Sequence, residues 1–194
     1  MGLGQSRTTY GTGIPVFQHK ILETAQSGGR LVTSGLVLGA FILAGTPVAL
    51  DESNHTATIV KTAKLQAAAG SSATTIRVEK GHHFAVGDHI AKTIGGTAVD
   101  ISGIDATNPA YDELTLSATL GTMAAGTGIF QAAAAGSNAV FAVKPTGLLY
   151  DDVKVSENQT LSVVIRGTAL ARRIPLYNAG LEAALPNIIF SQSH

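Results

Sequence analysis

The chain has 194 residues, with 13 Lys and Arg against 13 Asp and Glu, and only 13% of its residues are charged, where soluble domains average about 25%. This balance argues against a nucleic-acid-binding protein, which needs clustered cations, and the lack of Cys excludes thiol catalysis and Cys-based zinc sites. No apolar stretch is long enough to cross a bilayer and no secretory signal is visible in residues 1–20, so we expect no membrane partner.

Residues 1–30 are expected to form an extended N-terminal arm, because glycines and a proline interrupt the segment and it has little periodicity. The arm also carries apolar side chains that are costly to leave in water, namely Ile14, Val16, Phe17, Ile21 and Leu22. Three arrangements remain open at this point: a terminal strand on its own domain, an extended segment docked on a neighbouring subunit, and disorder.

Residues 31–70 are predicted to form short, closely spaced strands. Two apolar runs, 36–38 and 41–43, flank Gly39, and a turn at 44–47 precedes a third run at 48–50. Strands this short and this frequent are typical of a small β-sandwich or barrel.

Residues 71–131 are predicted to form an inserted β subdomain of about five or six strands. Small-residue connectors at 67–72 and 131–137 bound this block, Gly95-Gly96 gives a hairpin signal, and residues 114–117 alternate between Leu and hydroxyl side chains. The connectors are equally compatible with ordinary loops of one continuous sandwich.

Residues 132–194 are predicted to complete the β domain that begins with residues 31–70. The run Leu161–Gly167 is the strongest strand signal in the chain, and residues 178–185 predict a short helix with Leu181 and Leu185 on one face, ended by Pro186. A final strand is expected at 187–190. The predicted fold is therefore mainly β, a small sandwich or barrel built from 31–70 and 132–194, with one short C-terminal helix.

This C-terminal pattern resembles the capsid decoration proteins of tailed phages, which have a head-stabilising fold of the lambda type, also described as a β-tulip. Five short sequence motifs carry the resemblance, in the order strand, acidic turn, strand, short helix and final strand. They are Ala142-Val143 with Gly147-Leu148-Leu149, Tyr150-Asp151-Asp152, Val163-Val164-Ile165-Arg166-Gly167, Leu181–Leu185 and Ile188-Ile189-Phe190. Gly45-Thr46-Pro47-Val48 looks like the first strand pair of that family. The middle block is similar to segments of head-fibre proteins in phages of gut bacteria, at Val78–Phe84, Val86-Gly87-Asp88 and Tyr111-Asp112.

The resemblance implies a structural accessory protein of a phage head, without cofactor or reaction. It implies a homotrimer that binds the major capsid protein on the outer surface of the virion, after assembly in the cytoplasm of the host bacterium. The apolar arm residues would then add a strand to a capsid-protein sheet. Arg166, Arg172 and Arg173 are candidates for ion pairs across such an interface, or for side chains that cap strand ends in water.

Few residues suggest other chemistry. His82, His83 and His89 lie near Asp88, a set of ligand types that binds zinc or nickel, but adjacent histidines on a strand point to opposite faces, so solvated turn residues are the simpler interpretation. Likewise, an Asx turn explains the carboxylate of Asp105 better than catalysis does.

Neither a nucleophile elbow nor a phosphate-binding loop occurs in the sequence, so we expect no enzyme. The alternative to decoration is a carbohydrate- or host-surface-binding module at 71–131. Tyr111 is then the one candidate for a stacking platform, because the chain has no Trp.

Overall fold

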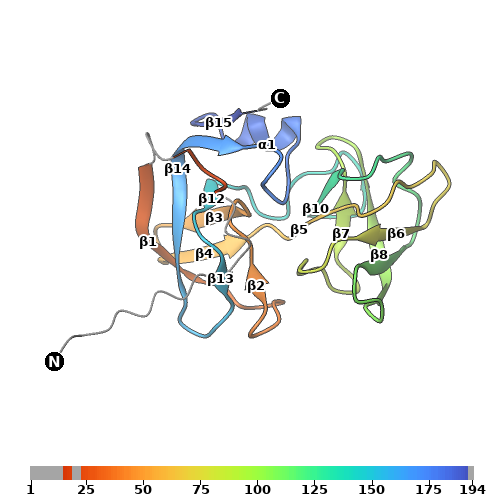
Figure 1. Cartoon of the computed structure of the whole chain (residues 1–194), viewed down its shortest axis with the longest axis horizontal. Helices are drawn as coiled ribbons and strands as arrows, with labels where there is room; N and C mark the ends of the chain where they lie inside the picture. Colours follow the sequence, from red (N-terminus) through yellow and green to blue (C-terminus); the bar gives the residue numbers. More distant parts are fainter. Residues whose placement is uncertain (1–14, 19–22, 192–194) are drawn as a thin grey trace.

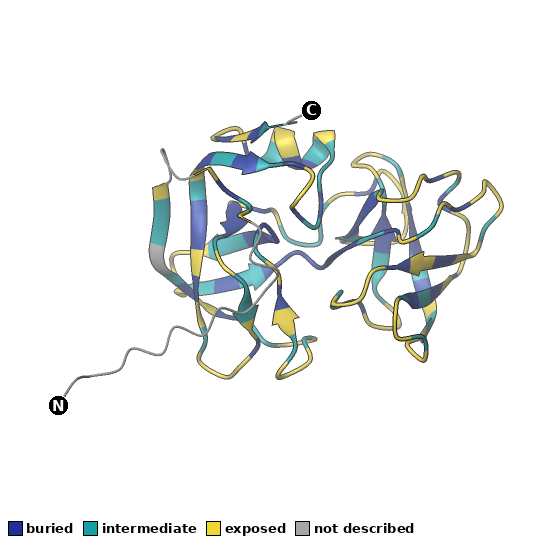
Figure 2. Ribbon diagram, viewed as in Figure 1, coloured by how far each residue is buried: buried dark blue, intermediate teal, exposed yellow. Residues whose placement is uncertain are grey.

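The computed structural model describes residues 15–18 and 23–191, and within these the protein is mainly β with one short helix, as the sequence predicts. Two β-barrels lie side by side along the long axis of the molecule (Figure 1). Buried residues line the strands of both barrels, and exposed residues gather on the connecting loops (Figure 2).

The first barrel is closed, since its first strand pairs antiparallel with one neighbour and parallel with the other in the order β1-β4-β3-β12-β14-β1. Its strands are β1 (Glu23–Leu31), β3 (Pro47–Asp51), β4 (Thr56–Ile59), β12 (Gly147–Leu149) and β14 (Thr160–Leu170). A small two-stranded sheet of β2 (Phe41–Ile42) and β13 (Val153–Lys154) covers one end. Alternating aliphatic side chains from these strands, such as Val48, Leu161 and Val163, fill the interior.

The C-terminal half of β14 continues beyond the barrel and pairs in parallel with β15 (Ile188–Ser191). The crossover between them contains α1 (Ala179–Ala184), whose N-cap is Asn178: its side chain accepts a hydrogen bond from the backbone N–H of Leu181 at 2.7 Å. Pro186 follows the end of the helix, as the sequence predicts. In the described part of the chain, no helix has the length and apolar character needed to cross a membrane.

The second barrel lies in sequence between β4 and β12, so it is an insertion. It contains seven strands, of which β6 to β10 fall in the block predicted to hold five or six and β5 and β11 lie outside it: β5 (Thr62–Lys64), β6 (Thr75–Val78), β7 (His89–Ala91), β8 (Thr97–Asp105), β9 (Asp112–Leu116), β10 (Gly128–Ala132) and β11 (Gly136–Ser137). The ring β5-β10-β7-β8-β9-β6 closes through a bridge between Leu65 and Val78, supported by two backbone hydrogen bonds of 2.9 Å. Its interior is a second aliphatic core.

A third buried cluster joins the two barrels. Phe130 of the inserted barrel packs at a ring-centroid distance of 4.6 Å on Phe141, and it shares this cluster with Leu176 and Leu181 of the C-terminal segment. Gly180 of α1 lies so close to the inserted barrel that a Cβ there would stand 2.3 Å from Ile94 Cγ1. The cluster therefore fixes one barrel against the other.

Three predicted boundaries are wrong. Residues 23–31 are a central strand of the first barrel and not part of an arm, because Gly29 lets β1 approach β4: a Cβ at that position would lie 2.6 Å from a backbone carbon of Thr56. The insertion begins at β5 and not at residue 71, and the small-residue run at 67–72 lies inside it, where Ala69 bridges to Met123. The insertion ends after β11, which pairs with β8, and not at residue 131.

Candidate functional site at the junction of the barrels

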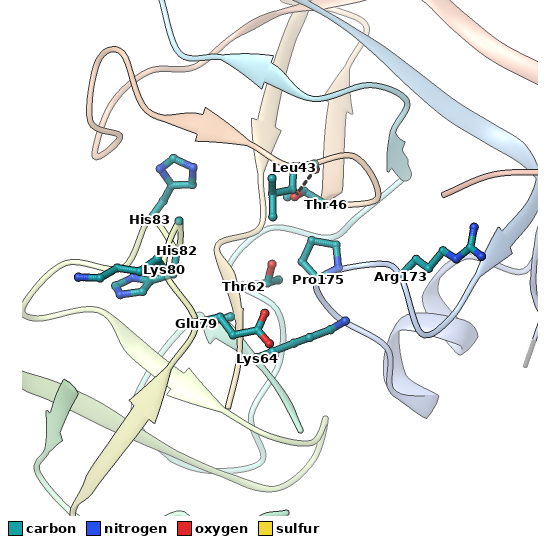
Figure 3. Close-up of a pocket in the computed structure, with 12 residues that line it drawn as sticks. Leu43, Thr46, Thr62, Lys64, Glu79, Lys80, His82, His83, Arg173 and Pro175 are labelled. Atoms are coloured by element: carbon teal, nitrogen blue, oxygen red, sulfur yellow. Dashed lines mark hydrogen bonds between the residues drawn. The ribbon is translucent and has the colours of Figure 1, made fainter. Parts of the chain in front are cut away.

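A pocket of about 110 Å³ lies where the two barrels meet (Figure 3). Four separate segments line it, and its polar lining residues are Thr46, Thr62, Lys64, Glu79, Lys80, His82, His83 and Arg173. Small-molecule sites usually measure about 300–1,000 Å³. The pocket is therefore too small for a sugar or a nucleotide.

The cations around the pocket are bound to partners within the chain. The ammonium of Lys80 pairs with the carboxylate of Asp112, and Arg173 Nη1 donates to the Pro15 carbonyl at 2.8 Å. In Figure 3 the side chain of Arg173 points away from Thr62 and the other residues at the centre. These two cations do not converge on one point, which an anion site requires.

Lys64 is the cation that stays closest to the pocket. Its ammonium donates to the Arg172 carbonyl at 3.1 Å. Burial lowers the pKa of Lys64, and the nearby charge of Glu79 acts in the opposite direction. Lys64 thus ties β5 to the segment that follows β14, and so links the inserted barrel to the first one.

The side chain of His82 is 5% exposed, and of its two ring nitrogens Nδ1 is hydrogen-bonded whereas Nε2 only faces a carboxylate. Its Nδ1 accepts from the backbone N–H of Phe84 at 3.2 Å, so the ring proton sits on Nε2, which lies 3.1 Å from Asp112 Oδ2. Burial lowers the pKa of His82, while the Asp112 carboxylate opposes that change. With no free lone pair, the ring is neither a metal ligand nor a general base in this arrangement.

His83 connects the two barrels directly. It is 8% exposed, and its Nε2 lies 3.1 Å from the backbone carbonyl oxygen of Phe41 on β2. Its Nδ1 has no hydrogen-bond partner among the described residues. Burial lowers the pKa of His83, the Phe41 carbonyl opposes this, and the neighbouring His82 and Lys61 lower it further.

The weak metal-site hypothesis for His82, His89 and Asp88 is contradicted by their separate partners. Asp88 Oδ2 pairs with Lys61 Nζ at 2.8 Å, whereas His89 Nδ1 pairs with Asp100. No group of three or more His, Asp or Glu side chains in the described residues is arranged to hold a metal ion. The interpretation of His82 and His83 as solvated turn residues is also wrong, because His83 lies against β2 and the His82 side chain lies against Asp112 and Phe84.

The described part of the predicted arm docks on its own domain. Phe17 forms a bridge with Ala169, stacks on Tyr150 at 6.0 Å and is buried, and the Val16 carbonyl accepts from Leu170 N at 2.8 Å. This corrects the expectation that Phe17 is free for a capsid contact. The other arm candidates, Ile14, Ile21 and Leu22, lie outside the described residues.

The three arginine candidates are all exposed, and they lie on two different segments. Arg166 is on β14 opposite Glu23 of β1, while Arg172 and Arg173 follow the end of that strand. Arg173 caps the described N-terminal segment through Pro15, which fits the capping interpretation. Arg166 and Arg172 remain predicted interface contacts.

Two further expectations concern the inserted barrel. Asp105 Oδ1 accepts from Thr107 N at 2.9 Å, which confirms the predicted Asx turn. The guanidinium of Arg77 lies over the ring of Tyr111, 4.8 Å from the ring centroid. One face of the candidate stacking platform is therefore covered.

Exposed apolar side chains lie on the two segments that meet at the junction, and we call this set the junction surface. They come from the 36–43 segment of the first barrel and from the loop before β7, with exposed fractions between 37% and 70%: Val37, Leu38, Phe41, Leu43 and Val86. The contact of His83 with the Phe41 carbonyl brings the two segments together. Sequence reasoning missed this surface because an apolar run split by Gly39 reads equally well as a pair of buried strands.

No family model, no curated protein and no solved structure matches this chain. The case for a function therefore rests on the residues themselves. At the junction, Lys64, Arg173 and His83 bind backbone carbonyls, Lys80 pairs with Asp112, and apolar side chains of the two segments face solvent. Such an arrangement is suited to contact with another macromolecule.

Proposed function

We propose that this protein is a structural accessory of a phage head, which binds the outer surface of the capsid as a homotrimer and cements or decorates it. The observation that carries the proposal is the junction surface, where apolar side chains from both barrels are left in water in the isolated chain. Exposed apolar side chains that gather at one site mark interaction surfaces. The capsid as partner rests on the resemblance of the C-terminal segment to decoration proteins.

The energy available at this surface is adequate for a lattice contact. Complete burial of a Val, Leu or Phe side chain contributes about 1.5–3 kcal/mol. The five residues are roughly half exposed, so covering them contributes about 1 kcal/mol each. Such a contact is weak alone, and many symmetric copies on one particle raise its strength through effective concentration.

A sugar-binding module is the less favoured alternative. Carbohydrate sites present a free aromatic face, and Tyr111 has Arg77 stacked on its ring. The junction pocket is also too small for a pyranose ring.

Two measurements test the proposal. Light scattering of the purified chain should give three times the 19.8 kDa chain mass. Co-expression with the major capsid protein of the same genome should give particles that carry the protein after sedimentation. A monomer at 100 μM that stays in the supernatant would contradict the proposal.

Variants locate the contact. Leu38→Ser with Val86→Ser should reduce the bound fraction at least tenfold, because two exposed anchors from different barrels are lost together. Ile189→Ser is the matched control, since Ile189 is 68% exposed on β15 and far from the junction surface (Figure 1). If both variants sediment like the unmodified chain, the junction surface is not the contact.

A further inference from the structure

The loop between β6 and β7 contacts the first barrel through a buried imidazole, and at the end of the loop Asp88 pairs with Lys61 of the connection between β4 and β5. His83 is the residue of this loop that reaches the backbone of β2, through Nε2 and the Phe41 carbonyl at 3.1 Å. Because a carbonyl only accepts, Nε2 carries a proton, and in the neutral ring Nδ1 carries the lone pair. This hydrogen bond is compatible with the neutral and with the charged ring, so the protonation of His83 in the closed arrangement is decided at Nδ1.

The surroundings of Nδ1 do not accommodate a second proton. This nitrogen is buried and has no acceptor among the described residues, so a proton there would be an uncompensated charge. The titratable groups that act on the ring are His82 from the same loop and Lys61 from the connection between β4 and β5, and both oppose a positive charge. The carboxylate of Asp88 is already paired with Lys61 at 2.8 Å.

The remaining charged groups near the ring do not compensate it either. They line the adjoining pocket and consist of three cations and one carboxylate: Lys64, Lys80, Arg173 and Glu79. Asp112, behind them, lies against Lys80 and His82. His82 differs from His83 in this respect, because a positive charge on His82 faces the Asp112 carboxylate.

We propose that His83 is a pH-sensitive latch between the two barrels, which holds the 79–88 loop against β2 when neutral and releases it when Nδ1 takes a proton from solvent. Release separates Phe41 from the loop that carries Val86, and so changes the junction surface. The hydrophobic cluster around Phe130 lies on other elements, so the barrels stay joined while the loop opens.

The sign of the pH dependence follows from proton linkage. Burial favours the neutral ring, so the open form takes up the proton more readily than the closed one. The latch is closed above the ordinary histidine pKa of 6.5 and opens as the pH falls below it. One proton changes the opening equilibrium by up to about tenfold per pH unit in that range.

A single introduced thiol measures the opening. The chain has no Cys, and Thr62 on β5 is buried and lines the same pocket, so Thr62→Cys places one protected thiol beside the latch. Its reaction rate with 4,4′-dithiodipyridine is divided by the rate of the urea-unfolded chain at the same pH. This ratio should rise from pH 6.5 to pH 5.5 by up to about tenfold.

Two further substitutions, each made in the Thr62→Cys variant, test whether His83 causes the rise in the rate ratio. His83→Gln keeps a side-chain donor for the Phe41 carbonyl but takes up no proton, and in this background the ratio should stay constant. His89→Gln removes a histidine that is about one-third exposed and paired with Asp100, and here the ratio should rise as in the parent. A constant ratio in the parent, or an equal rise in His83→Gln, overturns the proposal.

A second measurement decides the matter if His83→Gln does not fold. In NMR spectra of the unmodified chain, the His83 ring should titrate below 6.5 and the Ile42 amide, which follows the Phe41 carbonyl, should shift with the same midpoint. Titration of His83 at 6.5 with no response from Ile42 overturns the latch.

Discussion

Lys61 and Asp88 form the best-buried ion pair of the junction, and removing one partner should destabilise the protein strongly. Lys61 lies in the connection from β4 to β5, and its Nζ is 2.8 Å from Asp88 Oδ2, with the two side chains 9% and 15% exposed. Breaking a buried pair from one side costs about 3–5 kcal/mol, because the other charge stays buried without compensation. The substitution Lys61→Met keeps much of the side-chain volume and leaves the Asp88 carboxylate alone.

The expected loss of stability is smaller than this, because the Asp88 carboxylate also accepts hydrogen bonds from two other groups. Its Oδ1 accepts from Gln131 Nε2 at 3.1 Å, and its Oδ2 accepts from Ala85 N at 2.8 Å. Each hydrogen bond to a charged group contributes about 1.5–3 kcal/mol, and these two persist in the variant. We therefore expect Lys61→Met to lower the free energy of unfolding by about 2–4 kcal/mol, somewhat less than the usual cost of breaking a buried pair.

Urea unfolding followed by circular dichroism measures the loss. Asp88→Asn in the Lys61→Met background should recover at least about 1 kcal/mol, because the amide keeps an acceptor for Ala85 N and removes the unpaired charge. A loss below 1 kcal/mol for Lys61→Met, or a double variant less stable than the single one, would refute the reasoning.

Three further predictions concern β1, α1 and the histidines. Gly29→Ala should cost about 2–3 kcal/mol in urea unfolding, since its Cβ meets the backbone of β4, whereas Gly70→Ala, with open space around it, should be neutral or slightly stabilising; equal effects would argue against the strand pairing. Asn178→Ala removes the N-cap of α1 and should cost about 0.5–2 kcal/mol, and Asn178→Ser should restore most of it; a neutral Ala variant would contradict the cap. Because burial lowers the pKa of His82 and His83, the urea concentration at the unfolding midpoint should decrease as the pH is lowered from 7 to 5.5. A variant with Gln at both positions should lose this pH dependence; an unchanged pH dependence would assign it to other groups.

The elements that the sequence predicts well are those whose signal is local. The central part of β14 is a run of β-branched and aliphatic residues, and its strand is where the pattern places it. The short helix is marked by Asn178 at its start and Pro186 beyond its end, and both residues act through their own backbone neighbours. Mainly β structure follows from the same local patterns.

The elements that the sequence misses depend on distant parts of the chain. β1 contains Gly28 and Gly29 among polar residues and looks like a linker, but the close approach of β4, some 27 positions later, makes the glycine a requirement. The start of the insertion at β5 is set by pairing with β10. The burial of His83 depends on β2, more than 40 residues before it, and no periodicity around the histidine indicates that contact.

Closure of the two barrels limits how this protein can bind a partner. A closed barrel presents no free strand edge, so strand addition is confined in the described residues to elements outside the rings, such as β15. Contacts elsewhere have to use side chains on loops and short strands, and the junction surface contains five of the eight large apolar side chains that are exposed in the described residues. Four of its residues come from the first barrel, and Val86 comes from the inserted one. Their relative position is therefore set by the shared core around Phe130 and by the contact of His83 with Phe41, so the proposed latch would couple the geometry of the proposed binding surface to the protonation of one side chain.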